Sequence, residues 1–393
     1  MSNARNRIAR HVAELPKSGI RKFFDIVSRS KDVVSLGVGE PDFDTPWHIS
    51  RAAITCLENG GTHYTSNLGT PELRKAIAEY LKRRFSAEYS WERQILVTVG
   101  VSEAIDLAIR ALCSPGDEVI YHEPCFVSYA PTIRLAHAVP VPVATRFEDE
   151  FKLTVEELEK KVTPRTKALL LNFPCNPTGA ALERADMERI LDFAEKHDLV
   201  VLADEVYSEL VYPEDGEDVE NLTGFASFAR HRDRVVLLNG FSKSWAMTGY
   251  RLGYTAGPAD IVDAMMKIHQ YGIMSAPTPV QAAGVEAMAR GDRDVEKMRR
   301  EYRKRRDYMV EALNSMGLET LLPKGAFYLF PKISSTGMTS DEFAMRLLEG
   351  YSVACVPGAA FGSCGEGFVR MSYATGMDSL HLAIGRIGEM LVG

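Results

Sequence analysis

The chain has 393 residues, of which 46% are hydrophobic and 25% are charged, and its net charge is −7. This length suggests about two to three domains, and the composition is that of an ordinary globular protein. Because nucleic-acid binding needs a concentrated positive surface, the acidic balance argues against a DNA or RNA partner.

Segment 1–45 shows no sheet pattern of its own, and the first well-marked element is a helix over 71–84. Thr70 is its expected cap, and Pro71 occupies its first turn. Short apolar runs then alternate with amphipathic helices, which is the pattern of an α/β domain with a mostly parallel sheet. The predicted strands are 95–99, 118–121, 168–173, 199–203 and 235–238, and the predicted helices between them are 102–112, 155–161 and 185–197.

The last third of the chain changes character. A long helix over 294–316 carries apolar residues at helical spacing, and its basic run 299–306 is predicted to be a solvated face. A helix over 340–348 and a strand over 367–372 follow, which predicts a smaller α+β domain. We expect the N-terminal segment to join it, so the chain divides into segment 1–45, a large domain 46–285 and a small domain 286–393.

Cysteine usage and the N-terminal sequence indicate a cytoplasmic protein. The six cysteines are scattered and form no Cys-x-x-Cys pair, so we expect reduced thiols and no metal site. His122 and Cys125 lie three residues apart, but no second ligand pair stands near them. The first ten residues carry arginines without an apolar core, and no apolar run of about 18 residues exists, which predicts neither a signal peptide nor a membrane span.

The segment 240–251 is the most informative stretch. It places Lys243 between two serines directly after the apolar run 235–238, and Arg251 follows eight residues later. Burial at a strand end lowers the pKa of a lysine and frees its amine as a nucleophile. Hydroxyls and a guanidinium nearby suit a phosphate. Pyridoxal phosphate (PLP) needs both an amine partner and a phosphate cradle, so the segment predicts a PLP lysine, with a lysine of no catalytic role as the alternative.

Other polar motifs also follow predicted strands, where ligands collect in parallel sheets. Segment 100–104 opens a helix, so its N–H groups predict an anion site, with Ser102 as a plain helix cap as the alternative. Asn176 begins an Asn-Pro-Thr-Gly sequence that is otherwise typical of a β-turn. The chain contains no Gly-x-Gly-x-x-Gly or Walker sequence, which argues against a dinucleotide or ATP enzyme.

Asp204 directly follows the apolar run 199–203. A carboxylate there would be poorly solvated and needs a cationic partner, which the protonated nitrogen of a pyridine ring would supply. Tyr207 lies three residues on and could donate to the phenolate oxygen of that ring. A helix cap is the alternative role for Asp204.

In their order and placement, these motifs resemble those of the fold-type I PLP-dependent aminotransferases of class I/II. The resemblance implies an α/β fold: a large domain with a mostly parallel mixed sheet between helices, and a smaller α+β domain. The likeness runs from segment 37–43 to segment 369–372, and its specific matches are Gly-Glu-Pro-Asp-Phe 39–43, Asn-Pro-Thr-Gly 176–179, Asp-Glu-Val-Tyr 204–207 and the Ser-Lys segment ending at 249–253.

The resemblance implies a role for each matching residue. Lys243 would carry the cofactor as an imine and move the proton between the substrate Cα and the cofactor C4′. Asp204 would bind the pyridine nitrogen, and Asn176 and Tyr207 the phenolate oxygen. The phosphate would be held by the backbone amides of Val101 and Ser102 and by the side chains of Ser242 and Arg251.

Four further matches concern the ring, the substrate and the partner subunit. Phe126 matches the aromatic residue that stacks on the ring; other members have Trp or Tyr there, so a side-chain hydrogen bond is lost. Arg370 matches the arginine that grips the substrate α-carboxylate. Gly39 matches the backbone that closes over the substrate. Tyr64 matches the tyrosine that reaches the phosphate of the neighbouring subunit, which implies a homodimer with shared active sites.

The activity implied is transfer of an amino group from an L-amino acid to a 2-oxo acid with ping-pong kinetics. Segment 323–328 favours the aromatic or broad-specificity group. An aspartate-specific enzyme needs a second cation, for which Lys17 and Arg21 are candidates, although a solvated helix face is the alternative for both.

Three other functions stay open at this point. A carbon–sulfur β-lyase uses the same residues on the same scaffold. A PLP-binding regulator would need a helix-turn-helix module ahead of the fold, and only about 35 residues precede the resemblance. An oxidoreductase without PLP is disfavoured by the missing glycine sequence.

Overall fold

The structure is a computed structural model that describes residues 7–15, 32–213, 219 and 222–393. Seven strands form one sheet in the order β2-β8-β7-β6-β5-β3-β4. β8 (Gly253–Ala256) runs antiparallel to both of its neighbours, and the other pairs are parallel. The other strands are β2 (Ile95–Thr98), β3 (Glu118–Glu123), β4 (Val139–Ala144), β5 (Thr166–Asn172), β6 (Val200–Asp204) and β7 (Val235–Gly240).

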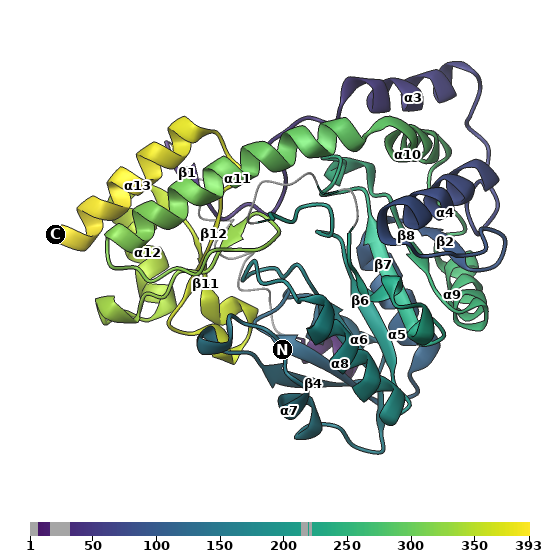
Figure 1. Ribbon diagram of the computed structural model, residues 1–393, viewed down its shortest axis with the longest axis horizontal. Coiled ribbons are helices and arrows are strands. Elements are labelled where there is room, and N and C mark those ends of the chain that lie inside the picture. The colour runs from purple at the N-terminus through teal and green to yellow at the C-terminus, as the bar shows by residue number, and fades with distance from the viewer. Residues whose placement is uncertain (1–6, 16–31, 214–218, 220–221) are drawn as a thin grey trace.

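Helices cover both faces of this sheet (Figure 1). Successive residues of a strand point to opposite faces, and the core clusters follow that alternation. Leu170 and Leu202 pack with α5 (Gly100–Leu112), whereas Leu169 and Val201 pack with α8 (Arg184–Lys196) on the other side. Because both faces are buried, these strands are continuous apolar runs.

A third cluster packs around the β2 end of the sheet, where α4 (Pro71–Phe85) and α10 (Thr278–Arg290) contribute buried residues. α10 also packs against α3 (Trp47–Glu58), and α5 packs against α9 (Ala259–Gly272). The long α11 (Asp292–Ser315) then runs from the large sheet to the small ones (Figure 1). The shorter helices are α1 (Arg10–Ala13), α6 (Tyr129–Leu135) and α7 (Val155–Glu159).

Two small sheets lie at the other end of α11. A three-stranded antiparallel sheet has the order β11-β12-β9, and α12 (Ser340–Tyr351) and α13 (Met377–Val392) lie beside it (Figure 1). β1 pairs in parallel with β10, so the chain after residue 31 joins its C-terminal part, while the domain boundaries stay a prediction. These strands are β1 (Val34–Ser35), β9 (Tyr328–Leu329), β10 (Val353–Ala354), β11 (Val356–Pro357) and β12 (Val369–Ser372).

The α/β architecture predicted from the sequence is confirmed, with element ends shifted by a few residues. The Thr70 cap is also confirmed, because its side chain accepts a hydrogen bond from Leu73 N. Ser102 as a helix cap was wrong. α5 begins two residues earlier, at Gly100, and Val99 is its N-cap.

The solvated face predicted for the basic run of α11 is confirmed for some of its residues and wrong for others. The side chains of Arg300 and Lys304 are 66% and 77% exposed, whereas Arg299, Arg305 and Arg306 are all less than 8% exposed. Arg305 donates to both carboxylate oxygens of Asp42, at 2.8 and 2.9 Å. Carboxylates and carbonyls from distant parts of the chain therefore cover this side of the helix.

Among the described residues, no helix combines the length and the apolar character that crossing a membrane requires.

Candidate active site

A cavity of about 560 Å³ opens at the carboxyl ends of β5, β6 and β7. Parallel strands bring their ends to one edge, so polar residues far apart in sequence meet there. Of the residues predicted for the site, all but Tyr64 line this cavity: Gly39, Val101, Ser102, Phe126, Asn176, Asp204, Tyr207, Ser242, Lys243, Arg251 and Arg370.

Lys243 follows β7, and it lines the cavity. Its Nζ donates to the carbonyl oxygen of Gly39 at 2.7 Å. The pKa of Lys243 is lowered to about 8, mainly by burial; Arg370 and Arg251 also lower it, while Glu40 and Asp204 act in the opposite direction. The lowered pKa increases the unprotonated share of the amine near neutral pH, as a nucleophile or a proton acceptor requires.

Asp204 is the last residue of β6 and only 4% exposed. Its two oxygens accept hydrogen bonds from the Tyr129 hydroxyl at 2.6 Å and from Val206 N at 3.3 Å. Burial raises the pKa of Asp204 to about 6, against the effect of these hydrogen bonds. Since both donors are neutral, the carboxylate would be stabilised by a cation in the cavity.

Asn172 and Asn176 form a chain of amides beside Asp204. Asn172 lies opposite Asp204 in the sheet register, and its Nδ2 donates to the Asp204 carbonyl at 2.9 Å. The Oδ1 atom of Asn172 accepts from Asn176 N at 3.0 Å. The turn after β5 is thus held against β6, and the side chain of Asn176 lines the cavity.

Arg370 lies on β12 and is 3% exposed. Its Nη1 donates to Asn176 Oδ1 at 3.0 Å and its Nη2 to the Gly37 carbonyl at 2.6 Å. Tyr328 stacks under the guanidinium, with its ring centroid 4.6 Å from Cζ. No described residue accepts a hydrogen bond from Arg370 Nε. A buried guanidinium with a free donor, paired only with neutral groups, can bind a carboxylate.

Two aromatic contacts shape the cavity wall. The hydroxyls of Tyr207 and Tyr328 lie 2.9 Å apart, which joins the segment after β6 to β9. Phe126 packs edge-on against Tyr129, with ring centroids 5.8 Å apart. The aromatic residue predicted for ring stacking is therefore in contact with the tyrosine that binds Asp204.

The start of α5 packs very tightly on the segment that follows β7. A Cβ atom on Gly100, whose φ is +75°, would lie 2.7 Å from Arg251 Nη2. A Cβ on Gly253 would lie 2.8 Å from Val101 N. With glycine at both positions, the first N–H groups of the helix and the guanidinium of Arg251 converge on one side of the cavity, as at other anion sites.

Tyr64 is the predicted site residue that lies elsewhere. It is 84% exposed and does not line the cavity of its own chain.

Among the described residues, one group, Asp192, Glu195 and His231, has ligand atoms close enough to hold an ion. Arg230 contacts the same oxygens, at 2.9 Å from Glu195 and 3.7 Å from Asp192. None of these residues lines the cavity.

The sequence of most of the chain matches a protein family. The model of the family "Aminotransferase class I and II" matches residues 31–387. The chain belongs to this family. It is an aminotransferase of fold type I, and the family uses PLP.

Individual relatives of this aminotransferase differ in specificity. The aspartate aminotransferase of Pyrococcus abyssi is 48% identical over 376 residues, which cover 95% of each chain. The aromatic-amino-acid aminotransferase 2 of Thermococcus litoralis is 46% identical over 376 residues, again 95% of each chain. The crystal structure of an aromatic aminotransferase from Pyrococcus horikoshii OT3 aligns with a TM-score of 0.89 at 44% identity, covering 95% of this chain and 98% of that one. Identity alone therefore does not separate the two specificities.

Sequence reasoning assigned no role to three residues of this aminotransferase's cavity region: Tyr129, Asn172 and Tyr328. Asn172 could have been found, because it is a polar residue near the end of the predicted strand 168–173; it is the last residue of β5, as Asp204 is of β6. The contacts of Tyr129 and Tyr328 span 75 and 121 residues, and no local pattern marks them.

Proposed function

We propose that the chain binds PLP at Lys243 and transfers the amino group of an L-amino acid to a 2-oxo acid. The observation that carries this proposal is one cavity in which three buried charges face neutral partners. Lys243 contacts a carbonyl, Asp204 contacts a hydroxyl and an N–H group, and Arg370 contacts a carbonyl and an amide. Each therefore retains unused charge for a ligand.

These three charges fit the groups of PLP and of an amino acid. Asp204 pairs with the pyridine nitrogen and keeps it protonated, and Asn176 and Tyr207 donate to the phenolate oxygen. The amides of Val101 and Ser102, the hydroxyl of Ser242 and the guanidinium of Arg251 hold the phosphate. Phe126 stacks on one face of the ring.

When bound, PLP supplies an electron sink that makes the Cα–H bond of the substrate acidic. Lys243 would hold the cofactor covalently through Nζ. As a free amine, the same Nζ would take the proton from the substrate Cα and return it at C4′, for which a pKa of about 8 is well suited. The same residues act in reverse on the second substrate, so the kinetics are ping-pong.

Arg370 orients the substrate. Its Nε and Nη groups bind the α-carboxylate in the bidentate manner that lysine cannot provide. The Gly39 backbone closes over the substrate. A Cβ there would lie 3.0 Å from the Tyr328 hydroxyl, so glycine avoids a tight contact at this point.

The substrate side chain in this proposal is aromatic or uncharged. Among the described residues that line the cavity, the cations are Lys243, Arg251 and Arg370, and all three already have a task. Glu40 lies at the rim, where it accepts from Thr248 at 2.9 Å, and it would repel a side-chain carboxylate. The candidate cations Lys17 and Arg21 lie outside the described residues.

The proposal includes a homodimer with shared sites. Large apolar side chains are exposed on α3, at residue 64 and around the end of α9, and exposed apolar side chains favour a protein partner where they gather. Hydrogen bonds from Asn67 Nδ2 to Met274 O at 2.8 Å and from Thr278 Oγ1 to His63 O at 2.6 Å join the segment that contains Tyr64 to the segment after α9. The exposed residues are Trp47, Ile54, Leu57, Tyr64, Tyr271, Ile273 and Met274.

A single half-reaction tests the proposal. Protein loaded with PLP is mixed with one amino acid and no 2-oxo acid, and the cofactor spectrum and products are followed. We expect one 2-oxo acid per site with conversion to pyridoxamine phosphate, fastest for an aromatic amino acid. Continuous release of ammonia and pyruvate would contradict it and indicate a β-lyase. A faster reaction with aspartate would contradict the specificity alone.

A further inference from the structure

Glu103 lies in the first turn of α5 but outside the cavity lining. Its Oε2 accepts a hydrogen bond from the backbone N–H of Val99, at 2.5 Å. Val99 is the N-cap of the helix, and its side chain cannot cap. The contact is related to half a capping box, in which an acidic residue reaches back to the N-cap N–H, but Glu103 lies four residues after the N-cap where that motif has three. Glu103 therefore fixes the peptide at which α5 begins.

The other oxygen of Glu103 faces His269 on α9. Nδ1 of His269 lies 2.7 Å from Glu103 Oε1, and the His269 side chain is 0% exposed. No described residue bonds its Nε2. The single polar contact of this buried ring is thus the one to Glu103. Burying an imidazole for one contact is costly, which indicates that the contact has a purpose beyond packing.

The phosphate cradle consists of the amides of Val101 and Ser102, the hydroxyl of Ser242 and the guanidinium of Arg251. Its geometry explains why the peptide at which α5 begins must be fixed. The amides of Val101 and Ser102 follow directly on the Val99–Gly100 turn. Gly100 lies against the Arg251 guanidinium, and Gly253 lies against Val101 N, both without room for a Cβ. A displacement of this turn by about 0.5 Å would misalign the amides and the guanidinium together, and such a shift is enough to weaken a binding site.

We propose that the Glu103–His269 pair is a positioning element for the phosphate cradle. It holds the start of α5 from the side opposite the cavity, so that the amides of Val101 and Ser102 and the guanidinium of Arg251 point at one anion. Glu103 points toward α9, so the pair does not contact the phosphate. This inference rests on the proposed PLP site.

The test compares ligands with and without a phosphate. The full-length chain is stripped of cofactor and titrated with PLP and with pyridoxal, and the two Kd values are measured by absorbance. For His269→Phe, which keeps the ring volume and removes the donor, we expect PLP to bind about tenfold more weakly. Pyridoxal binding should change by less than about twofold. The affinity for inorganic phosphate, measured by its competition with PLP, should fall by a similar factor to the affinity for PLP.

Two further variants separate positioning from general damage. His269→Asn places an amide nitrogen near the position of Nδ1 and should restore most of the PLP affinity. His231→Phe removes another buried histidine, which faces α8 and does not line the cavity, and it should leave both Kd values unchanged.

The proposal is overturned if His269→Phe weakens PLP and pyridoxal equally or weakens neither. If His269→Phe does not fold, the same two Kd values are measured for Glu103→Gln. The glutamine side chain has a single acceptor oxygen, so it accepts from only one of the two N–H groups, that of Val99 or that of His269. This variant should weaken PLP about threefold and leave pyridoxal unchanged, and equal changes for both ligands would overturn the proposal. If the unaltered chain binds PLP no better than pyridoxal, the phosphate cradle itself is wrong, which is a failure of the proposed function.

Discussion

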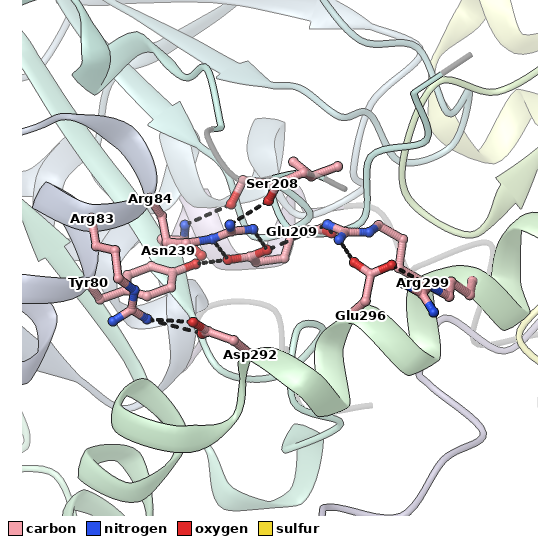
Figure 2. Close-up of polar contacts among 11 residues, drawn as sticks. Tyr80, Arg83, Arg84, Ser208, Glu209, Asn239, Asp292, Glu296 and Arg299 are labelled. Atoms are coloured by element: carbon pink, nitrogen blue, oxygen red, sulfur yellow. Dashed lines mark hydrogen bonds and ion pairs between the residues drawn. The ribbon is translucent and has the colours of Figure 1, made fainter. Parts of the chain in front are cut away.

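Two of the regions that bury charged side chains in this molecule satisfy them in opposite ways. In the network at the start of α11 (Figure 2), Glu209 accepts from Arg84 at 2.7 and 3.0 Å and from the Tyr80 hydroxyl at 2.6 Å. Arg299 pairs with Glu296 in the same network. In the cavity, by contrast, Lys243 and Asp204 are hydrogen-bonded to neutral groups.

Buried charges that are paired with an opposite charge stabilise the fold, whereas buried charges with only neutral partners are available for a reaction. A buried carboxylate paired with a guanidinium keeps its charge, and its removal leaves the partner unpaired. A buried charge without such a partner shifts its pKa toward neutrality, as Lys243 and Asp204 do. Such shifts are typical of functional sites. We therefore expect substitutions in the cavity to change activity, and substitutions in the α11 network to change stability.

The largest expected effect is that of Lys243→Ala. It removes the amine that holds the cofactor and moves the proton, so turnover should fall by about 10⁴-fold or more. The thermal unfolding midpoint should stay close to that of the unaltered chain. The matched control is Lys267→Ala, an exposed lysine that pairs with Asp263, which should keep full activity. Retention of most activity by Lys243→Ala would contradict the mechanism.

Glu209→Ala should have the largest effect on stability. It leaves the Arg84 guanidinium, only 12% exposed, without its carboxylate, and breaking a buried pair costs about 3–5 kcal/mol. Urea unfolding measures the change. The control Glu157→Ala breaks exposed pairs with Lys160 and Arg146 and should cost less than about 1 kcal/mol. Equal costs would remove the distinction between the α11 network and a surface pair.

Arg370→Ala should weaken amino-acid binding. Loss of a charged bidentate contact costs about 1.5–3 kcal/mol, so KM for the amino acid should rise roughly 10- to 100-fold. The visible absorbance of bound cofactor should be retained, because Arg370 is assigned to the substrate and not to PLP. An unchanged KM would place the carboxylate contact elsewhere.

The pKa of Lys243 predicts a smaller effect, on the stability of the protein without cofactor. The folded pKa of about 8 lies below the ordinary value of about 10.4. Between these two pH values the unfolded chain binds more protons, so stability rises with pH across this window. Below pH 8 the cost of burying the charged amine is fully present.

The comparison of the unaltered chain with Lys243→Met isolates this contribution. Urea unfolding at pH 7 and at pH 10 should show a rise that the variant lacks, on the order of 1–3 kcal/mol. The same pH dependence in both proteins would show that Lys243 has an ordinary pKa.

The sequence predicted the cavity well where local patterns determine it. Strands β5 to β7 are buried on both faces and therefore appear as continuous apolar runs, and the polar residue at each end stands out. Asp204, Asn176 and Lys243 were found in this way. Because the carboxyl ends of parallel strands lie at one edge of the sheet, these side chains are expected to lie close together. The distances between them do not follow from the sequence.

Contacts between distant segments could not be predicted in the same way. The helical spacing of α11 correctly placed its apolar side but did not show that Asp42 covers Arg305. In the same way, no local pattern indicates that Tyr129 binds Asp204 across 75 residues. The burial of a charged residue depends on which partner arrives from elsewhere in the chain.

Borohydride reduction of the PLP-loaded protein, followed by peptide mass spectrometry, identifies the lysine that holds the cofactor. We expect one pyridoxyl group per chain, attached to Lys243. Attachment to another lysine, or no attachment at all, would contradict it.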